Sequence, residues 1–405
     1  MATDVRIYKL QGKVQHYSWG GYQFIPELLR MKNDDQKPFA EYWLGAHPNH
    51  PGMLQLDGSE VALNAFIEQD KQKALGTTVV NSFGSLPFLL KILDVRQMLS
   101  IQVHPSKAAA ELGYEEENKK GIAVNASNRN YKDDNHKPEL LVALSDFWLL
   151  HGFKPADQLK EVLSADPELA FLVDEFDNSG YKGLYEKVML MEQAEVNRIL
   201  EPVISRIMPL YENGELLKKQ EDFWAARAVE AFCKDGNYDR GIFSIYFFNL
   251  LHLKEGQGIY QPAQLPHAYL EGQNVEIMAN SDNVLRAGLT DKYIDVAELL
   301  KHVRFEETVP NILGSDQREK GEMHFATPAP EFEIVQYDLD EGDVEQLHAE
   351  SAEIILVLRG GINIEAGEKT LKVAHGEAAF VLAETAYRLE AMSAAEVFRA
   401  RVPKK

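Results

Sequence analysis

Short apolar runs separated by turn-forming residues dominate the first part of the chain. Residues 86–93 and 140–144 are two such runs, and the string HPNHPG at 47–52 is one such turn. Short strands with frequent turn signals are typical of a β-sandwich or β-barrel. The pattern therefore predicts a β-rich unit from about residue 5 to residue 150.

Between residues 155 and 239 a helical pattern replaces the short apolar runs. Apolar side chains there recur at spacings of three and four residues, as one face of an α-helix requires. The clearest series are Val196, Ile199, Leu200, Val203 and Ile207, and Trp224, Ala228 and Phe232. This block predicts a helical insertion in the β-rich unit.

Apolar runs that predict strands resume after the insertion. Residues 241–253 form the longest apolar run, which falls short of the ~20 residues that span a bilayer and is predicted as a buried strand. Residues 296–303 predict a short helix, and residues 308–327 a linker. Further apolar runs with glycine-bearing turns then predict a second, smaller β-sandwich. They occupy residues 332–337, 354–358, 362–364, 371–373 and 378–382.

Composition narrows the classes of partner. The 405 residues include 63 acidic and 42 basic side chains, and this formal net charge of −21 argues against an extended nucleic-acid or anionic-membrane surface. Cys233 is the single cysteine and has no internal disulfide partner, which predicts a reducing compartment, the cytoplasm by default. The first residues include Asp4 and lack the apolar run of a signal peptide.

Candidate metal ligands begin with the string SIQVHP at residues 100–105. Gln102 and His104 alternate with Ile101 and Val103, so both would point to one face of a strand. An amide oxygen and an imidazole two residues apart can share one ion. A hydrogen-bonded core histidine is the alternative.

A carboxylate and a second histidine follow later in the chain. Glu139 stands where a polar loop becomes an apolar strand, so it could ligate a metal or act as a base, and Lys137 nearby could hold an anion. A solvated charged turn is the alternative. His267 comes after a proline-bearing turn and completes a set of one amide, one carboxylate and two imidazoles. Zinc and non-haem iron both suit these donors.

The segment 276–290 is unusually polar within apolar surroundings. Arg286 is permanently charged and can make a forked contact, so it could bind a phosphate or stabilise a developing oxyanion. A structural ion pair with Asp282 or Glu276 is the alternative, and the pattern alone leaves both interpretations open.

Six short strings of the chain, taken in their order along the sequence, are characteristic of one family. They are YSWG at 17–20, LPFLLK at 86–91, LSIQVHP at 99–105, NHKPE at 135–139, PHAYL at 266–270 and SDNVLRAG at 281–288. In this order they resemble the type I mannose-6-phosphate isomerase family. Six separate matches are far more specific than any one of them. The C-terminal part resembles the family only in its strand texture.

The resemblance implies a cupin-class enzyme with one zinc ion per chain that interconverts mannose 6-phosphate and fructose 6-phosphate. The family treats the arginine matching Arg286 as catalytic, and the lysine matching Lys137 lies in the same pocket. Leu265 departs from the pattern, because relatives often carry a small polar residue there, and it could alter the pocket edge. His47 and His50 match no family ligand and are interpreted as turn residues. The residues matching the zinc ligands are Gln102, His104, Glu139 and His267.

The resemblance also implies a mainly β fold with an α insertion, made of two cupin-type jelly-roll β-sandwiches and a helical domain. Residues 1–154 and 240–310 would form the catalytic cupin domain, and residues 155–239 the helical insertion. Residues 311–405 would form a C-terminal cupin-like β-sandwich with a structural or pocket-closing role.

Aldose–ketose conversion needs a base that moves a proton between adjacent carbons, and stabilisation of an enediolate. Zinc and Arg286 are expected to stabilise the charge. The Lys137 and Glu276 neighbourhood is the favoured source of the base among Glu276, Asp282, His136, Lys137 and a zinc-bound water. Phosphate contacts are expected from Lys91, Lys137, Arg286 and Lys292 with Ser100 as a neutral donor. His136 and Tyr269 complete the expected substrate-binding set.

Two other functions stay open at this point. An iron-dependent cupin oxygenase would use the same four ligands, and a non-catalytic sugar-phosphate binding protein would have kept the pocket but lost turnover. The chain is expected to act as a monomer on a phosphosugar, with no nucleic-acid or membrane partner.

Overall fold

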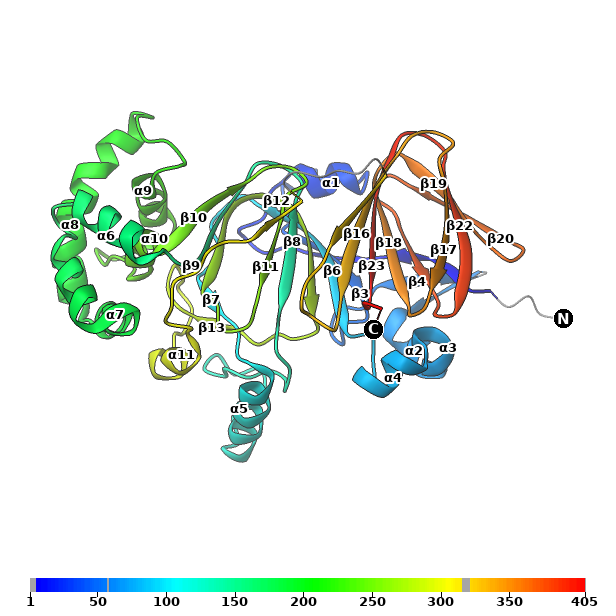
Figure 1. The fold of residues 1–405 in the computed structure, drawn as a ribbon, viewed down its shortest axis with the longest axis horizontal. Coiled ribbons are helices and arrows are strands. Elements are labelled where there is room, and N and C mark those ends of the chain that lie inside the picture. The colour runs from blue at the N-terminus through cyan, green and yellow to red at the C-terminus, as the bar shows by residue number, and fades with distance from the viewer. Residues whose placement is uncertain (1–4, 57, 315–320, 405) are drawn as a thin grey trace.

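A computed structural model of the chain describes residues 5–56, 58–314 and 321–404. It is mostly β, with several antiparallel sheets, and the predicted mainly β class with a helical part is confirmed. In Figure 1 the helices of residues 156–247 gather at one end of the long axis. A central β unit and a C-terminal β unit follow along it. No helix in the described ranges is both long and apolar enough to cross a membrane.

An antiparallel sheet forms the body of the central unit. Its strands are β2 (Lys13–Gln15), β3 (Glu41–Gly45), β6 (Phe88–Val95), β7 (Gln102–Val103), β8 (Glu139–Ala143), β9 (Phe147–Phe153), β10 (Phe248–Leu253), β11 (Gly258–Gln261), β12 (His267–Ala279), β13 (Leu285–Arg286) and β14 (Ile312–Leu313). They lie in the order β14-β11-β8-β12-β6-β3-β2, and β7 and β9 pair with the first part of β12. The strands predicted at 86–93 and 140–144 are confirmed as β6 and β8.

Both faces of β6 are buried, and its alternating side chains separate two cores. Leu93 packs in the interior of the central unit with Leu141. Leu90, on the opposite face, packs in a core shared with the C-terminal unit, which includes Phe380. Because side chains alternate along a strand, Lys91 faces the same interior as Leu93.

An eight-stranded and a four-stranded sheet make up the C-terminal unit. The first has the order β15-β16-β23-β18-β21-β1-β4-β5, and the second β17-β22-β19-β20. The predicted C-terminal strands are confirmed as β16, β18, β19, β20 and β21, whereas β15, β17, β22 and β23 were not predicted. The bounds are β15 (Glu322–Phe325), β16 (Glu333–Leu339), β17 (Val344–Ala349), β18 (Glu353–Arg359), β19 (Gly361–Ala366), β20 (Lys369–Ala374), β21 (Ala378–Val381), β22 (Thr385–Ala391) and β23 (Ala395–Arg401).

Three strands from the start of the chain extend the eight-stranded sheet. They are β1 (Ile7–Gln11), β4 (Met53–Leu56) and β5 (Ser59–Ala62). β1 pairs with β21, and Tyr8 lies opposite Phe380. Hydrogen bonding therefore continues across the boundary expected between residues 1–154 and residues 311–405.

The helical pattern predicted for residues 155–239 is confirmed. The helices are α6 (Ala156–Ala165), α7 (Phe171–Leu190), α8 (Gln193–Glu212) and α9 (Glu221–Phe232), and the short helix expected at 296–303 is α11 (Val296–His302). Their buried side chains, Trp224 among them, form one core with Val103, Leu150 and Leu285 of the central unit. The helices thus cover the outer face of β7, β9 and β13.

The strand predicted for residues 241–253 is wrong in its first half. This stretch forms α10 (Gly241–Phe247) and only then β10. Every residue of α10 is buried, so the helix has no polar face. A continuous apolar run has no periodicity that separates a buried helix from a buried strand.

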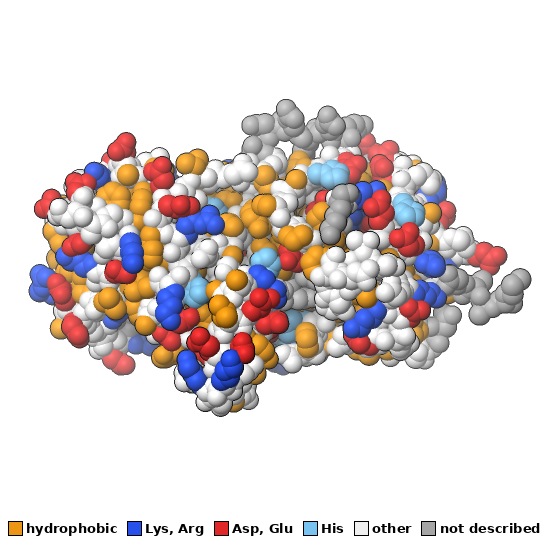
Figure 2. Space-filling model, turned by 60° about the horizontal axis from the view of Figure 1, so that its bottom comes forward, with side chains coloured by type: hydrophobic (Ala, Val, Ile, Leu, Met, Phe, Trp, Pro, Cys, Tyr) orange, Lys and Arg blue, Asp and Glu red, His pale blue; other side chains and the backbone are white. Residues whose placement is uncertain are grey.

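Five helices were not predicted. They are α1 (Phe24–Leu28), α2 (Leu63–Gln69), α3 (Lys71–Leu75), α4 (Thr77–Phe83) and α5 (Lys107–Lys119). α5 projects from the central unit in Figure 1, and the hydroxyl of Ser106 caps its first turn by accepting the Ala109 N–H. Figure 2 turns this side of the molecule toward the viewer and shows basic and acidic side chains interspersed over it.

Candidate active site

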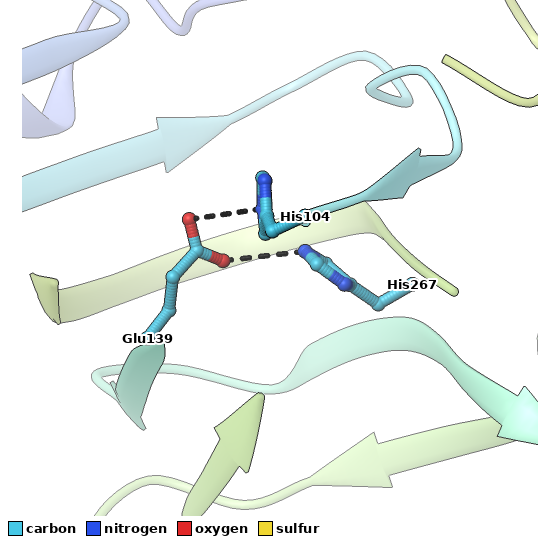
Figure 3. Close-up of side chains that lie close together, drawn as sticks. All are labelled: His104, Glu139 and His267. Atoms are coloured by element: carbon cyan, nitrogen blue, oxygen red, sulfur yellow. Dashed lines mark ion pairs between the residues drawn. The ribbon is translucent and has the colours of Figure 1, made fainter. Parts of the chain in front are cut away.

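Three buried side chains converge in the interior of the central unit (Figure 3). The carboxylate of Glu139 lies between two imidazoles: its Oε1 is 3.5 Å from His104 Nε2, and its Oε2 is 3.2 Å from His267 Nε2. The exposed fractions of His104, Glu139 and His267 are 0%, 3% and 2%. All three can present ligand atoms to one metal ion.

Neighbouring strands bring these groups together. Glu139 begins β8 and His267 begins β12, while His104 directly follows β7. Gln102 lies opposite His267 in the register of β7 and β12, and opposite Arg286 in the register of β7 and β13. Directly opposed residues share a face of a sheet, so Gln102 belongs to the same interior as the triad.

A β-bulge in β12 lets both halves of this strand serve the interior. The pairing with β9 shifts between Tyr269 and Glu271, and Gly272 follows with a φ of 124°. A Cβ at Gly272 would stand 2.6 Å from the Asp146 carbonyl oxygen, so only glycine fits there. Odd-numbered Tyr269 and even-numbered Glu276 consequently face the same side, and the Tyr269 hydroxyl donates to Glu276 Oε2 at 2.7 Å.

The triad has the chemistry of a metal centre. His104 Nδ1 donates to the Asn283 carbonyl at 2.7 Å and His267 Nδ1 to the Leu265 carbonyl at 3.0 Å, which leaves both Nε2 lone pairs facing Glu139. His104 Nε2 is buried and has no hydrogen-bond partner in the described part of the chain. A cation between these groups would satisfy that nitrogen, and backbone bonds of this kind orient metal-binding imidazoles. Zinc accepts imidazole and carboxylate donors.

The protonation states suit metal binding. Burial lowers the pKa of His104 to about 4, so the ring is neutral near pH 7 and its lone pair is available. Burial alone would raise the pKa of Glu139, but the Lys137 ammonium and the two imidazoles outweigh it and hold this pKa well below its ordinary value. Lys137 Nζ lies 3.0 Å from Glu139 Oε1.

A second buried ionic cluster adjoins the triad. Lys91 Nζ lies 3.1 Å from Glu276 Oε1 and 3.5 Å from Glu41 Oε2, and it stands over the Trp43 ring. Burial opposes the charge of Lys91, but the two carboxylates outweigh it and raise its pKa. Burial raises the pKa of Glu276, with Glu139 adding to this effect and Lys91 opposing it.

A cavity of about 640 Å³ opens beside both clusters. Its lining is cationic in a protein of net charge −21. The charged side chains that line it are Lys91, Lys132, Lys137, Lys234, Arg286 and Lys292, with Glu41, Asp282 and Asp291.

Most of the predicted site residues meet at this cavity. Those that line it are Ser100, Gln102, Lys91, Lys137, Asp282, Arg286 and Lys292, whereas Glu276 and Tyr269 are buried behind Lys91. His136 lies elsewhere: its Nε2 donates to Glu331 Oε1 at 2.6 Å, across the contact with the C-terminal unit. Leu265 is buried, and its carbonyl holds the His267 ring.

The structure does not contain the alternative ion pair of Arg286 with Asp282 or Glu276. Asp282 pairs with His47, and Glu276 pairs with Lys91. Within the described ranges Arg286 forms no ion pair, and burial alone lowers the pKa of its guanidinium. An unpaired, half-buried cation at a cavity favours a ligand anion.

Several residues at the site were not predicted from the sequence, among them Lys132, Lys234 and Asp291 of the cavity lining. Glu41 and Trp43 face the interior from β3, and His47 follows this strand and contacts Asp282. The alternate spacing of Glu41 and Trp43 was the available signal, but only the fold places them beside Lys91.

Tyr269→Phe tests whether this hydroxyl is structural. Burial, then Glu276 and Glu139, raise the pKa of Tyr269, so the phenol stays a donor to Glu276. Its loss leaves a buried carboxylate oxygen without its donor, and we expect the free energy of unfolding to fall by about 2 kcal/mol with zinc content unchanged. Urea denaturation measures this, and Tyr293→Phe, at a side chain 51% exposed, is the control. Equal stability of the two variants would contradict the expectation.

The antiparallel β fold, the buried His–Glu–His centre and the cationic cavity define the class: a metal-dependent enzyme for a small anionic substrate. A family profile described as phosphomannose isomerase type I, catalytic domain, matches residues 7–156. The chain is 37% identical to the mannose-6-phosphate isomerase of Escherichia coli, over 93% of this chain and 94% of the relative. It is 31% identical to mannose-6-phosphate isomerase 1 of Arabidopsis thaliana, over 98% and 94%.

Solved structures agree. A crystal structure of the Salmonella typhimurium enzyme, described as bound to substrate (fructose 6-phosphate) and zinc, has a TM-score of 0.88 and 33% identity over 99% of this chain and 100% of that chain. A mannose 6-phosphate isomerase described as bound with zinc and yttrium has a TM-score of 0.87 at 33% identity. The chain belongs to the mannose-6-phosphate isomerase family, which confirms the resemblance of the six strings.

Proposed function

We propose that the chain is a zinc-dependent aldose–ketose isomerase that interconverts mannose 6-phosphate and fructose 6-phosphate. The observation that carries this is the buried triad of His104, Glu139 and His267 beside a cavity with six basic side chains. A phosphosugar dianion needs such cations. Family membership confirms the predicted enzyme class over the oxygenase and the binding protein.

Gln102, His104, Glu139 and His267 hold one zinc ion in this proposal. When bound, zinc supplies Lewis-acid stabilisation of negative charge on the substrate oxygens. The triad supports the assignment through its converging Nε2 and carboxylate atoms, and Gln102 through its register with His267.

Lys137 and Glu276 are the proposed proton-transfer groups. Lys137 lines the cavity and touches Glu139, so it lies between the metal centre and the substrate space. Glu276 stands behind it, held by Lys91 and Tyr269 in an ionic cluster that adjoins the cavity. Asp282 is a further catalytic candidate that lines the same cavity. A positioned base contributes typically about 10²- to 10⁴-fold to such a proton transfer.

Arg286 and Lys292 are the proposed anion-binding pair, with Ser100 as a neutral donor. Both cations line the cavity, and neither forms an ion pair within the described ranges. Burial, then the nearby charge of Arg286, lower the pKa of Lys292, which supports a site where two cations lie close together. An anion relieves their repulsion. Lys91 already serves two carboxylates, and His136 is engaged by Glu331, so their substrate contacts remain predictions.

The organisation of the chain forms part of the proposal. Residues 1–154 and 240–310 form a catalytic cupin-type jelly roll, 155–239 the helical insertion and 311–405 a cupin-like β-sandwich. A monomer acting on a phosphosugar belongs to the same proposal. A cytoplasmic location is supported by Cys233, which is a free thiol.

Chelation tests the proposed function directly. We expect the purified protein to convert mannose 6-phosphate to fructose 6-phosphate, to lose this activity with its zinc on chelation, and to regain it when zinc is restored. Elemental analysis for zinc and iron accompanies the assay. Turnover that survives complete removal of the metal, or that returns only with iron, would reject the zinc assignment.

A further inference from the structure

A histidine that matches none of the proposed ligands contacts the substrate cavity from behind. His47, in the loop after β3, is only 5% exposed, and its Nε2 lies 3.3 Å from Asp282 Oδ2. Asp282 lines the cavity. The sequence of this loop predicts a simple turn, but a turn does not require a buried imidazole beside a carboxylate.

The surroundings of His47 fix its ring and its tautomer. The backbone N–H of Asn49 donates to His47 Nδ1 at 3.3 Å, so the neutral ring carries its proton on Nε2, the nitrogen that faces Asp282. Trp43 packs edge-on against the ring at a centroid distance of 4.9 Å, and His50 stacks on it at 6.3 Å. The imidazole therefore has one orientation in which to donate.

Asp282 is held from both ends. Its backbone N–H donates to Asp133 Oδ2 at 2.7 Å, which anchors the loop after β12. His47 binds one carboxylate oxygen, and within the described ranges the other oxygen has no hydrogen-bond partner. The side chain of Asp282 is 41% exposed, and it is exposed toward the cavity.

The other acids of the cavity are committed to cations. Glu41 lies beside Lys91, and Asp291 lies 3.5 Å from Lys234. Asp282 alone of the three is held by an imidazole. An ionised carboxylate only accepts hydrogen bonds, and it repels a phosphate, so its free oxygen suits a hydroxyl group of the substrate.

We propose that His47 is a positioning residue: it orients the Asp282 carboxylate so that the free oxygen accepts a hydrogen bond from a sugar hydroxyl in the cavity. This inference rests on the proposed function for the identity of the sugar. Its geometry, His47 Nε2 at 3.3 Å from Asp282 Oδ2 with Nδ1 accepting the Asn49 N–H, stands independently.

A matched pair of amide substitutions tests the role of Nε2. The side-chain amide of His47→Gln reaches the position of Nε2, whereas that of His47→Asn reaches only the position of Nδ1. We expect His47→Asn to lower kcat/KM by roughly 10- to 100-fold, the loss of one hydrogen bond to a charged group. His47→Gln should restore most of it. Equal losses in the two variants would overturn the proposal.

A double-mutant cycle separates positioning from mere stability. If His47 acts through Asp282, His47→Asn in an Asp282→Ala background should lower kcat/KM no further. Independent, multiplying effects would overturn the proposal. Zinc content and thermal midpoints of all variants report whether the fold is kept.

Nitrogen NMR of the His47 ring makes the test independent of turnover. The expected form is protonated on Nε2 in the unmodified protein, and that resonance should shift in Asp282→Ala. A ring protonated only on Nδ1 would overturn the proposal even in an active enzyme. The protein could instead be inactive while its His47 ring is protonated on Nε2 and the His47 and Asp282 variants show coupled effects on fructose 6-phosphate affinity. That result would reject only the proposed function.

Discussion

Replacing His267 with alanine is expected to remove the zinc ion and to lower turnover by about 10³-fold or more. His267 supplies one of two imidazoles to a buried triad, and Glu139 shares its carboxylate between them. A metal ion contributes several kcal/mol of charge stabilisation, and each 1.36 kcal/mol corresponds to a tenfold change in rate. Zinc per chain, measured by elemental analysis, and the isomerase rate should fall together.

Two further variants make this result specific. Glu139→Gln keeps the shape of the side chain but removes its charge, and should also lower zinc content. His324→Ala removes an imidazole that is 50% exposed and lies beside Glu322, far from the triad in the chain, and should keep both zinc and turnover. If His267→Ala folds and retains one zinc per chain, His267 is not a zinc ligand.

The local pattern of the chain predicted elements whose periodicity is clear. β6 and β8 were found because apolar runs of strand length lie between turn signals, and α8 because Val196, Ile199 and Val203 recur on one face. α10 was not predicted because a fully buried helix has no polar face. The pairing of β1 with β21 was not predicted for another reason. Strands that are hundreds of residues apart carry no local sequence pattern that indicates their pairing.

The site shows the same division. The two-residue spacing of Gln102 and His104 and the strings around Glu139 and His267 predict a shared metal centre, and the structure brings His104, Glu139 and His267 together. The contact between His47 and Asp282 was not predictable, because it joins the loops after β3 and β12. The role of Glu276 on the interior depends on a bulge in β12 that reverses the alternation, and no strand pattern reveals such a shift.

Arg286→Ala is expected to lower kcat by about 10²- to 10³-fold while zinc stays bound. Removing one preorganised donor to a developing oxyanion typically costs this much. Arg286 lines the cavity, has no ion pair within the described ranges, and lies opposite Gln102 in the register of β13 and β7. Its charge is therefore available to the substrate, while the triad keeps all of its own ligand atoms. Steady-state kinetics and elemental analysis on the same samples measure the two effects separately.

The comparison variants decide what the guanidinium does. Arg286→Lys keeps the charge but loses the fork, so partial recovery of kcat would assign the effect to charge, and no recovery to the bidentate geometry. Arg198→Ala removes an arginine on α8 that is 72% exposed, and should leave kcat and zinc unchanged. Full turnover of Arg286→Ala at full zinc occupancy would remove Arg286 from the mechanism. Loss of zinc in this variant would instead make it part of the scaffold that holds Gln102, because β13 pairs directly with β7.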